Sequence, residues 1–335
     1  MLIEDRITDI CHQTNFNGRI LIAKGRDILF ESSFGYADLE KKIPFSKKSI
    51  FRIGSITKQF TAVSILQLVE KGLLKLSDTI DHFIDGVTYD QSITIHHLLS
   101  NSSGIPSFDI HGDYDHLLAS DSFHERMIKE IIFKKPLNFI PGERFEYSSS
   151  GFFILTHIIE VISKMPYHLY LKMYIFDVLG MKQSGFNFID QKVPGFVSLY
   201  DMKENKIIPA IPYDMRKASG AGGLYSSTYD LFLYGRGLIE YRLITKPMVD
   251  MMFDIQTPIN SQGGYGYGVI SLHFNLNNKT HESIYHPGNG PGVFAQMMII
   301  DRDIQIIALS NINDKKTFHA CFKELESFVN EHIII

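Results

Sequence analysis

A serine and a lysine stand three residues apart at the start of an apolar run, in the stretch FRIGSITKQF. From Ser55 to Leu74 the apolar residues are spaced for the buried face of a helix, and Gly72 is typical of a helix stop. Residues i and i+3 share one face of a helix, so the amine of Lys58 can reach the hydroxyl of Ser55. Burial would lower the pKa of this lysine and let it accept the proton of a serine nucleophile. The alternative is that Ser55 only caps the helix, as serines at helix starts often do.

Two later stretches carry further groups that could take part in chemistry. PGERFEYSSSGF places Tyr147 between a Pro-Gly turn and a predicted helix; the alternative is a ring packed in the protein with its hydroxyl in water. In YHPGNGPGVF, His286 lies on an apolar strand and is followed by glycines. Glycine in a strand often marks the close approach of a ligand, and the N–H group that follows can stabilise an oxyanion. A β-bulge or hairpin turn with an unrelated histidine is the alternative here.

In this order the three motifs resemble the signature of serine β-lactamases and penicillin-binding proteins. The motifs are Ser55-Ile56-Thr57-Lys58, Tyr147-Ser148-Ser149 and His286-Pro287-Gly288. The pattern is similar to the class C-like branch, which uses a tyrosine motif and includes esterases and D-amino-acid peptidases. The resemblance spans roughly residues 15 to 325, through IFRIGSITKQFTA, ITIHHLLSNSSGIPSF, FEYSSSGFFILTHIIE, GAGGLYSSTYDLFLYGRGL, YGYGV and a strand ending in LSN.

This resemblance implies a role for each residue of the motifs. Ser55 would attack a carbonyl carbon, while Lys58 and Tyr147 would share the proton during acylation. The N–H groups of Ser55 and of Asn289, which follows Gly288, would form the oxyanion hole. Tyr147 would then help water to release the acyl group. No cofactor is implied.

Two residues depart from the family pattern. Ser149 stands where the middle motif usually ends in asparagine, and its shorter hydroxyl predicts weaker contact with a peptide-like substrate. His286 stands where β-lactamases and carboxypeptidases usually have lysine, and its charge is full only below its pKa, about 6.5 when unperturbed. We therefore expect weak attraction for a substrate carboxylate near neutral pH, and hydrolysis of esters or small amides in preference to β-lactams.

The elements around these motifs predict an α/β (α+β) fold. GRILIAKG and DILFESSFGYAD flank a turn at residues 25–27 and predict a hairpin, which a short helix at 2–13 precedes. Near the other end, GYGYGVISLHF, ESIYHPG, VFAQMMIID and IQIIALSN predict four strands, and KKTFHACFKELESFVNEH predicts a closing helix. We expect an antiparallel sheet flanked by helices and built from 1–75 plus 261–335. Residues 76–260 would form an inserted, mainly helical domain, with the active cleft between the two domains.

The composition is that of a globular protein of enzyme size, with 335 residues, 44% hydrophobic and 21% charged. A net charge of -4 and the lack of a Lys/Arg-rich run argue against a nucleic-acid partner. No stretch approaches the roughly 18 apolar residues of a membrane span. Glu4, Asp5 and Asp9 interrupt any secretory leader, so a cytoplasmic protein is expected, although a mature form trimmed of its export signal would read the same. The sequence leaves the oligomeric state open.

The cysteines and histidines do not suggest a metal site. Cys11 and Cys321 are far apart in the sequence, and we expect two buried thiols. HESIYH, at residues 281–286, is one residue too long for the zinc motif H-E-x-x-H and lies on a predicted strand. Its two histidines should therefore point to opposite faces. His96 and His97 are neighbours on a helix, where adjacent residues do not face one another, so a buried or capping role is expected.

We therefore expect a serine hydrolase that forms an acyl-enzyme with an ester, amide or lactam, in a small molecule or a short peptide. Two alternatives stay open. One is a non-catalytic penicillin-recognising or scaffolding relative, which the departures at Ser149 and His286 keep open. The other is an acyltransferase, in which an alcohol or amine replaces water.

Overall fold

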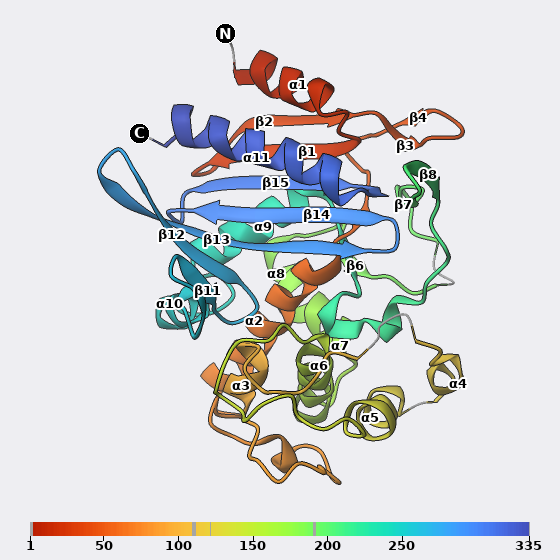
Figure 1. Cartoon of the computed structure of the whole chain (residues 1–335), viewed down its shortest axis with the longest axis vertical. Helices are drawn as coiled ribbons and strands as arrows, with labels where there is room; N and C mark the ends of the chain where they lie inside the picture. The colour runs from red at the N-terminus through yellow and green to blue at the C-terminus, as the bar shows by residue number, and fades with distance from the viewer. Residues whose placement is uncertain (1–2, 109–111, 121, 190–191, 335) are drawn as a thin grey trace.

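An eight-stranded antiparallel sheet crosses the molecule in the computed structural model, which describes residues 3–108, 112–120, 122–189 and 192–334. Its strand order is β10-β11-β12-β13-β14-β15-β1-β2. The strands near the amino terminus are β1 (Gly18–Lys24) and β2 (Asp27–Phe34). The strands near the carboxyl terminus are β10 (Thr257–Asn260), β11 (Gly263–Tyr265), β12 (Ile270–Leu276), β13 (Lys279–Gly290), β14 (Val293–Ile300) and β15 (Ile304–Ser310). The prediction of a sheet built from both chain ends is confirmed (Figure 1).

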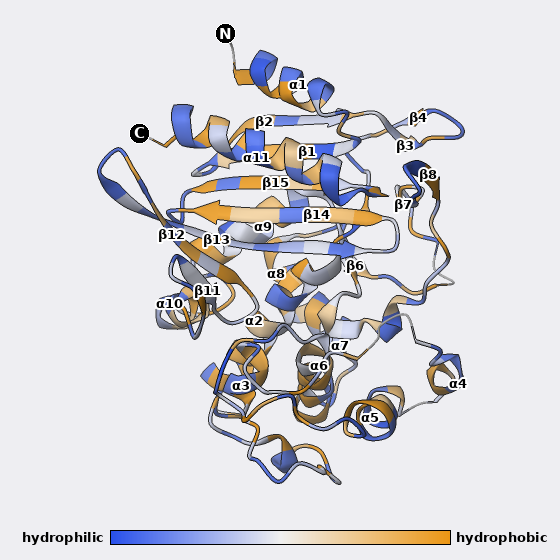
Figure 2. Ribbon diagram, in the orientation of Figure 1, coloured by the Kyte–Doolittle hydropathy of each residue, from blue (hydrophilic) through white to orange (hydrophobic). Residues whose placement is uncertain are grey.

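Helices from both ends of the chain cover one face of the sheet. These are α1 (Ile3–Gln13) and α11 (Lys315–His332), which lie side by side in Figure 1. On the other face, α9 (Thr228–Ile239) packs against β1 and β15. Neighbouring residues of a strand point to opposite faces, so Ile306 joins the core under the terminal helices and Ile307 joins the larger core. Figure 2 shows β14 and β15 as largely orange with polar interruptions, and the residues of both strands are all buried.

The helix that follows Ser55 begins later than expected. The chain first makes a 3₁₀ turn at Gly54–Ile56, in which Gly54 has a left-handed φ of 50°, and only then enters α2 (Thr57–Glu70). The predicted helix over 55–74 is therefore too long at both ends. Gly72 does end it, with a φ of 67° that glycine adopts at little cost. Every residue of α2 from Thr57 to Leu68 is buried, so this helix runs through the interior.

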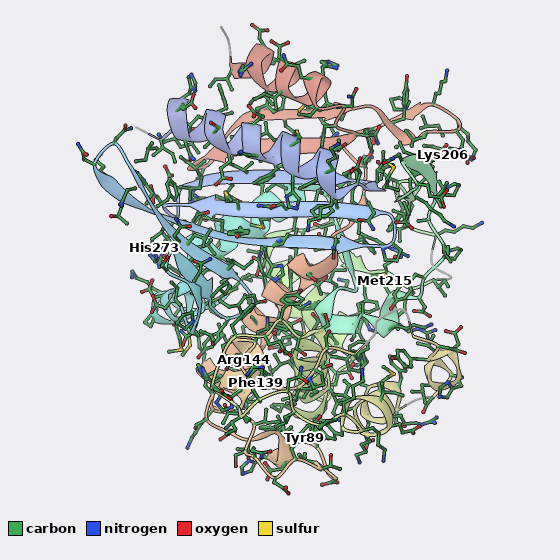
Figure 3. The ribbon with its side chains drawn as sticks, viewed as in Figure 1. Tyr89, Phe139, Arg144, Lys206, Met215 and His273 are labelled. Carbon is green, nitrogen blue, oxygen red and sulfur yellow. The ribbon has the colours of Figure 1, made fainter. Side chains whose placement is uncertain are left out.

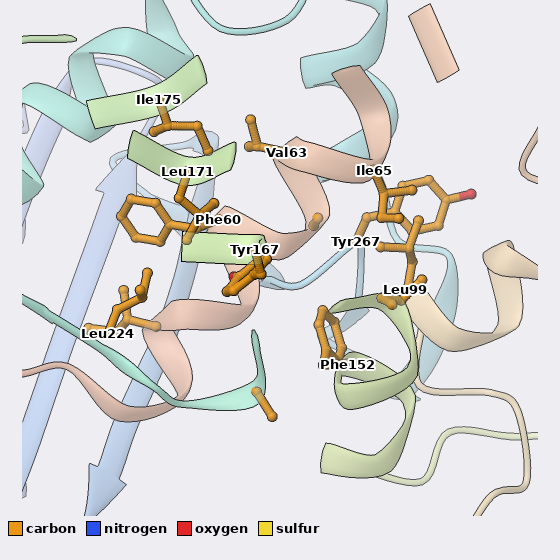
Figure 4. Close-up of a cluster of buried hydrophobic side chains, with 14 of the residues drawn as sticks. Phe60, Val63, Ile65, Leu99, Phe152, Tyr167, Leu171, Ile175, Leu224 and Tyr267 are labelled. Atoms are coloured by element: carbon orange, nitrogen blue, oxygen red, sulfur yellow. The ribbon is translucent and has the colours of Figure 1, made fainter. Parts of the chain in front are cut away.

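The remaining helices are α3 (Ile95–Leu99), α4 (Asp115–Leu118), α5 (Phe123–Met127), α6 (Ser149–Ser163), α7 (Tyr167–Leu171), α8 (Asp177–Leu179) and α10 (Lys246–Phe253). Most of them lie below the sheet in Figure 1, where α6 and α7 contact α2, whereas α10 lies beside β11. Short π-helical turns occupy Ile128–Ile132 and Lys172–Phe176, and further 3₁₀ turns lie at Ile80–His82, Met215–Lys217 and Ser219–Ala221. Figure 4 shows how Phe60 of α2 packs beside Tyr167 and Leu171 of α7. We propose that these helices belong to the inserted domain expected at 76–260.

Small sheets tie the connecting segments together. The first joins β3 (Tyr36–Asp38) to β4 (Ile43–Pro44), and another joins β16 (Ile312–Asn313), β7 (Tyr200–Lys203) and β8 (Lys206–Pro209). A third has the order β5 (Phe51–Arg52), β9 (Leu224–Ser226) and β6 (Gly185–Phe186). In this third sheet the strand just before Ser55 pairs with the strand just after Gly223. Two segments that are distant in sequence are thereby held beside each other at the start of α2.

Candidate active site

The hydroxyl of Ser55 accepts two hydrogen bonds, from the nearby Lys58 and from Tyr147, which is distant in the sequence. The Nζ atom of Lys58 lies 3.2 Å from Ser55 Oγ, and the hydroxyl of Tyr147 donates to the same oxygen at 2.8 Å. Neither the 3₁₀ turn nor α2 begins with a side-chain cap. The alternative of a capping serine is therefore wrong, and Ser55 Oγ instead faces an amine and a phenol.

Lys58 is fully buried, with an exposed fraction of 0%. Burial penalises the ammonium form and lowers the pKa of Lys58 to about 7. Its Nζ also donates to the carbonyl of Ala221 at 2.7 Å and approaches Ser149 Oγ at 3.5 Å. Near neutral pH, a large share of these lysines is thus uncharged and able to accept a proton.

Tyr147 is held in place by the residues on either side of it. The N–H of Glu146 donates to the carbonyl of Asn101 at 2.9 Å, and the N–H of Ser148 donates to the Asn101 side chain at 3.0 Å. Although 39% of the residue is exposed, its hydroxyl points inward to Ser55. Burial of the hydroxyl raises the pKa of Tyr147 and the bond to Ser55 lowers it, with burial the larger effect. The phenol therefore keeps its proton at neutral pH.

The same loop is anchored further back. The N–H of Asn138 donates to the carbonyl of Gly104, and that of Gly142 donates to the carbonyl of Ser102, both at 2.8 Å. In Figure 3, Arg144 and Phe139 lie next to each other, with the guanidinium carbon 4.1 Å from the ring centroid. These contacts fix the loop that ends at Tyr147.

His286 lies deep in β13, with 2% of its surface exposed. Its Nδ1 is 2.6 Å from the carbonyl of Pro287, which can only accept, so Nδ1 carries the proton. The hydroxyl of Tyr265 is 3.0 Å from Nε2 and is its donor. Burial, with a smaller effect from the charge of Lys58, lowers the pKa of His286 to about 3. The expectation of a titration near 6.5 is therefore corrected, because desolvation keeps this imidazole neutral.

Glycines let β13 approach the turn that carries Ser55. A Cβ on Gly288 would lie 1.9 Å from the carbonyl oxygen of Ile53, and a Cβ on Gly54 would lie 2.7 Å from the backbone N of Asn289. Any side chain at either place would push the two segments apart. The close approach brings Asn289 and Ser55 to the wall of the same cavity.

This cavity, which we call the site cavity, has a volume of about 370 Å³. Its lining includes Ser55, Tyr147, Ser149, His286 and Asn289, whereas Lys58 lies behind the wall. An apolar cluster on the segment 213–223 forms another part of the lining, made by Tyr213, Met215 and Ala218. The structure thus brings the predicted motifs to one cavity that a small molecule can enter.

Three residues that hold the motifs had no role assigned from sequence. Asn101 accepts a hydrogen bond from Ser148, the neighbour of Tyr147. Ala221 accepts one from Lys58, and Tyr265 contacts His286. Each lies in a stretch that resembles the family, LSNSSG, GAGGL or YGYGV. Similarity in these stretches was the available signal, but it did not indicate which atoms they present to the site.

The remaining sequence predictions concern metal, membrane and thiols. In the parts of the chain that the structure describes, no group of three or more His, Cys, Asp or Glu side chains could hold a metal ion. No helix within the described ranges has both the length and the apolarity to cross a membrane. His97 closes a capping box with Thr94, as a capping role predicted. Cys11 and Cys321 are both buried, and their sulfur atoms lie 3.9 Å apart between α1 and α11.

The whole arrangement is similar to that of known proteins. A family model described as Beta-lactamase matches residues 12–324. Penicillin-binding protein 4* of Bacillus subtilis is 31% identical over 326 residues, which cover 88% of this chain. The chain spans 68%, 64% and 43% of the lengths of three curated relatives, that protein among them.

Solved structures agree in fold. An octameric penicillin-binding protein homologue from Pyrococcus abyssi is 30% identical, with a TM-score of 0.78 over 92% of this chain and 72% of that one. A D-amino acid amidase from Ochrobactrum anthropi, at 21% identity, has a TM-score of 0.80 and covers 98% of both chains. With the family model matching almost from end to end, the chain belongs to the β-lactamase family of serine β-lactamases and penicillin-binding proteins.

Proposed function

We propose that the protein is a serine hydrolase that forms an acyl-enzyme on Ser55. The observation that carries this proposal is the double hydrogen bond to Ser55 Oγ, from Lys58 Nζ at 3.2 Å and from the Tyr147 hydroxyl at 2.8 Å. A serine hydroxyl is a weak nucleophile unless a base stands beside it. A lysine whose pKa is about 7 supplies that base at the pH of most cells.

The reaction proceeds in two halves. Ser55 Oγ attacks the substrate carbonyl carbon as its proton passes to neutral Lys58, and the new C–O bond gives a tetrahedral oxyanion. The N–H groups of Ser55 and Asn289 stabilise that oxyanion. When it collapses, the bond to the leaving alcohol or amine breaks, and the leaving group takes the proton through Tyr147. Water then attacks the acyl carbon as its proton passes to the same pair. The bond between that carbon and Ser55 Oγ breaks, Oγ takes the proton back, and the acid is released.

The neutral state of His286 favours uncharged substrates. A substrate carboxylate at this motif would meet a buried imidazole with no positive charge, and desolvating a carboxylate without a partner is costly. Esters and amides lack that charge. We therefore infer a preference for small esters or amides, including D-amino-acid derivatives, over β-lactams that carry a carboxylate. The D-amino acid amidase of the same fold is consistent with this substrate class.

A fluorophosphonate probe tests the nucleophile directly. Intact-protein mass spectrometry should show one adduct on the wild-type chain and none on Ser55→Ala. Ser163→Ala, which changes a serine at the carboxyl end of α6, is the matched control and should label fully. If the wild type forms no adduct with this probe or with a penicillin, the non-catalytic alternative replaces the hydrolase.

Substrate preference needs a separate measurement. The kcat/KM values for nitrophenyl esters and for a chromogenic cephalosporin are compared on the same preparation, and we expect the ester value to be higher. A clear preference for the cephalosporin would contradict the role inferred for neutral His286. Adding an amine or alcohol distinguishes hydrolysis from acyl transfer, since transfer gives a new ester or amide product.

A further inference from the structure

The segment 213–223 separates the site cavity from a second cavity. Met215 and Ala218 line the site cavity, whereas Arg216 and Ser219 line the second, which has a volume of about 650 Å³ and which we call the rear cavity. Figure 3 places Met215 on this segment, between the sheet and the helices. Contacts made in the rear cavity therefore act on the segment 213–223, which also lines the site cavity.

Three side chains of the rear cavity form a hydrogen-bonded chain. His124 of α5 lies with Nδ1 2.7 Å from Glu160 Oε2 of α6, and with Nε2 2.8 Å from Ser219 Oγ. A carboxylate only accepts hydrogen bonds, so Nδ1 carries a proton and donates it. In a neutral ring, Nε2 then accepts from the Ser219 hydroxyl. The side chains of His124 and Glu160 are 19% and 25% exposed, which leaves the chain of bonds open to the rear cavity.

This serine, histidine and glutamate do not make a second nucleophilic site. Ser219 is 0% exposed, so a substrate carbonyl has no access to its oxygen. The N–H of Gly220, which would be the adjacent oxyanion donor, is already bonded to Thr156 Oγ1 at 3.1 Å. The bond from His124 instead holds a backbone that is strained, because Ser219 has a left-handed φ of 43°.

The residues that follow Ser219 reach Lys58. The carbonyl of Ser219 accepts the N–H groups of Gly222 and Gly223 at 3.1 and 2.7 Å, which closes a tight turn. Within this turn, the carbonyl of Ala221 accepts the hydrogen bond of Lys58 Nζ at 2.7 Å. Hydrogen bonds thus connect Glu160 through His124 to Ser219, and the turn that follows Ser219 carries the carbonyl that bonds Lys58.

We propose that His124 and Glu160 are positioning residues, which clamp Ser219 and so hold the carbonyl of Ala221 against the amine of Lys58. The inference rests on the proposed function of Lys58 as the general base. A carbonyl oxygen beside an amine favours its charged form and opposes the effect of burial. The position of the Ala221 carbonyl therefore contributes to the basicity of Lys58, against the larger effect of burial. Losing the clamp should lower the basicity of Lys58.

Other charged or titratable groups surround both ends of this path. Lys58 faces the phenol of Tyr147, 4.8 Å from Nζ to the ring centroid, and the imidazole of His286. The groups near His124 are its chain neighbour Glu125, which pairs with Lys129, His157 and Glu160 on α6, His168 on α7 and Arg216 on the segment 213–223. His124 bonds directly to both Glu160 and Ser219, so substituting it breaks the clamp while leaving these neighbours in place.

The test is a titration of Lys58 itself. The ¹³Cε signal of Lys58, assigned by its loss in Lys58→Met, is followed against pH in the wild type, His124→Phe and Ser219→Ala. We expect both variants to lower the pKa of Lys58 by about one unit, since hydrogen bonds to charged groups are worth this much. His124→Gln, whose amide can still reach Ser219 Oγ, should retain most of the wild-type value. An unchanged Lys58 pKa in both His124→Phe and Ser219→Ala overturns the proposal.

A matched control comes from the same cavity. His168 lines it and meets the ring of Phe188 edge-on at 5.1 Å, so His168→Phe removes an imidazole without touching the clamp. Its Lys58 pKa should equal that of the wild type, and a shift equal to that of His124→Phe would contradict the proposal. Thermal unfolding checks that each variant folds. If His124→Phe does not fold, the Lys58 pKa of Ser219→Ala alone tests the proposal.

The titration also separates this inference from the proposed function, because it requires no turnover. If the wild type forms no adduct at Ser55, the hydrolase proposal fails, while the Lys58 signal still decides whether the clamp acts. If turnover occurs, the acid limb of kcat/KM should move to lower pH in His124→Phe by the same shift as the Lys58 pKa. An acid limb that stays in place while the Lys58 pKa moves would show that Lys58 is not the base.

Discussion

The hydroxyl of Tyr265 lies 3.0 Å from Nε2 of His286, and it occupies the one lone pair that the imidazole has left. The other nitrogen, Nδ1, keeps its proton and donates a hydrogen bond to the carbonyl of Pro287. Both ring nitrogens are thereby satisfied in the neutral form, and burial opposes a second proton. A strand position that often carries a lysine in the family instead presents an uncharged ring to the site cavity.

Nuclear magnetic resonance should report this neutral state. We expect the ¹⁵N shifts of His286 to match the Nδ1–H tautomer and to stay constant from about pH 5 to pH 9, because its pKa is lowered to about 3. Loss of the signal in His286→Gln assigns it. A His286 midpoint near 6.5 would contradict the inferred tautomer and the substrate preference drawn from it.

The pH dependence of kcat/KM follows from Lys58 and Tyr147. Activity should rise with pH through about 7, as Lys58 loses its proton and becomes a base. It should then stay level to about pH 9, since an unperturbed tyrosine ionises near 10 and burial raises the pKa of Tyr147 further. Initial rates with a neutral ester, whose own charge does not change, give this profile. A fall of kcat/KM between pH 6 and pH 8 would contradict the roles given to Lys58 and Tyr147.

Replacing the buried lysine should separate activity from stability. Lys58→Met keeps most of the volume but removes the amine, so kcat should fall at least about a hundredfold. Stability at pH 6 should not fall and should rise by about 2 kcal/mol, because the folded state of the wild type holds a desolvated charge there. The pKa of Lys58 in the fold is below that of the unfolded chain, so this gain shrinks as pH rises from 7 towards 10.5.

Chemical denaturation of both proteins at pH 6 and pH 9 measures these differences. A Lys58→Met protein with near wild-type kcat would contradict the proposed role of Lys58 as the general base. A variant that is much less stable than the wild type at both pH values would show that the contacts of Lys58 with Ala221 and Ser55 outweigh its desolvation.

Gly288→Ala should disrupt the site through the backbone. Its Cβ would lie 1.9 Å from the carbonyl oxygen of Ile53 and 3.3 Å from the backbone N of Ser55, so the strand and the turn must separate. We expect a loss of about 1–3 kcal/mol in stability, as for other overpacked sites, together with loss of probe labelling at Ser55.

Gly290→Ala is the control for stability, because a Cβ there meets only a side-chain atom of Val293 at 3.7 Å. Its unfolding midpoint should remain at the wild-type value. Equal stability and equal labelling in Gly288→Ala and the wild type would contradict the close approach of β13 to the turn.

The thiols of Cys11 and Cys321 should be inert in the folded protein. Both residues are 1% exposed, so a thiol reagent such as dithionitrobenzoate cannot reach their sulfur atoms. We expect no fast reaction in native buffer and two thiols per chain in guanidinium chloride. Rapid titration of either thiol in native buffer would show that the contact between α1 and α11 opens easily.

Much of the candidate site could be inferred from residue order alone. Ser55 and Lys58 are three residues apart, and local helical geometry is sufficient to bring their side chains together. Strands β1, β2, β13, β14 and β15 also follow from local patterns, because alternation and turn residues act over a few positions. The helix at Lys315–His332 coincides with its predicted stretch for the same reason. The stretch GYGYGVISLHF, predicted as one strand, instead contributes to β11 and β12, and β10 was not predicted.

Other features depend on contacts between residues that are distant in the chain. The left-handed Gly54 displaces the start of α2, since β13 lies against this turn and leaves space only for a glycine. The charge state of His286 could not be read from its neighbours in sequence, because Tyr265 and the burial around it decide that state. The clamp on Ser219 likewise joins residues 95 positions apart.

The sequence by itself determined which groups are available: a serine with a lysine one helical turn away, a tyrosine, a histidine and the glycines that let strands approach. Only the tertiary structure decided their protonation and their partners. Burial changes the free energy of a charge by more than any local sequence effect, and burial is set by the packing of the whole chain. The sequence therefore specifies a serine, a lysine and their neighbours, while the fold lowers the pKa of the lysine to about 7 and keeps the histidine neutral.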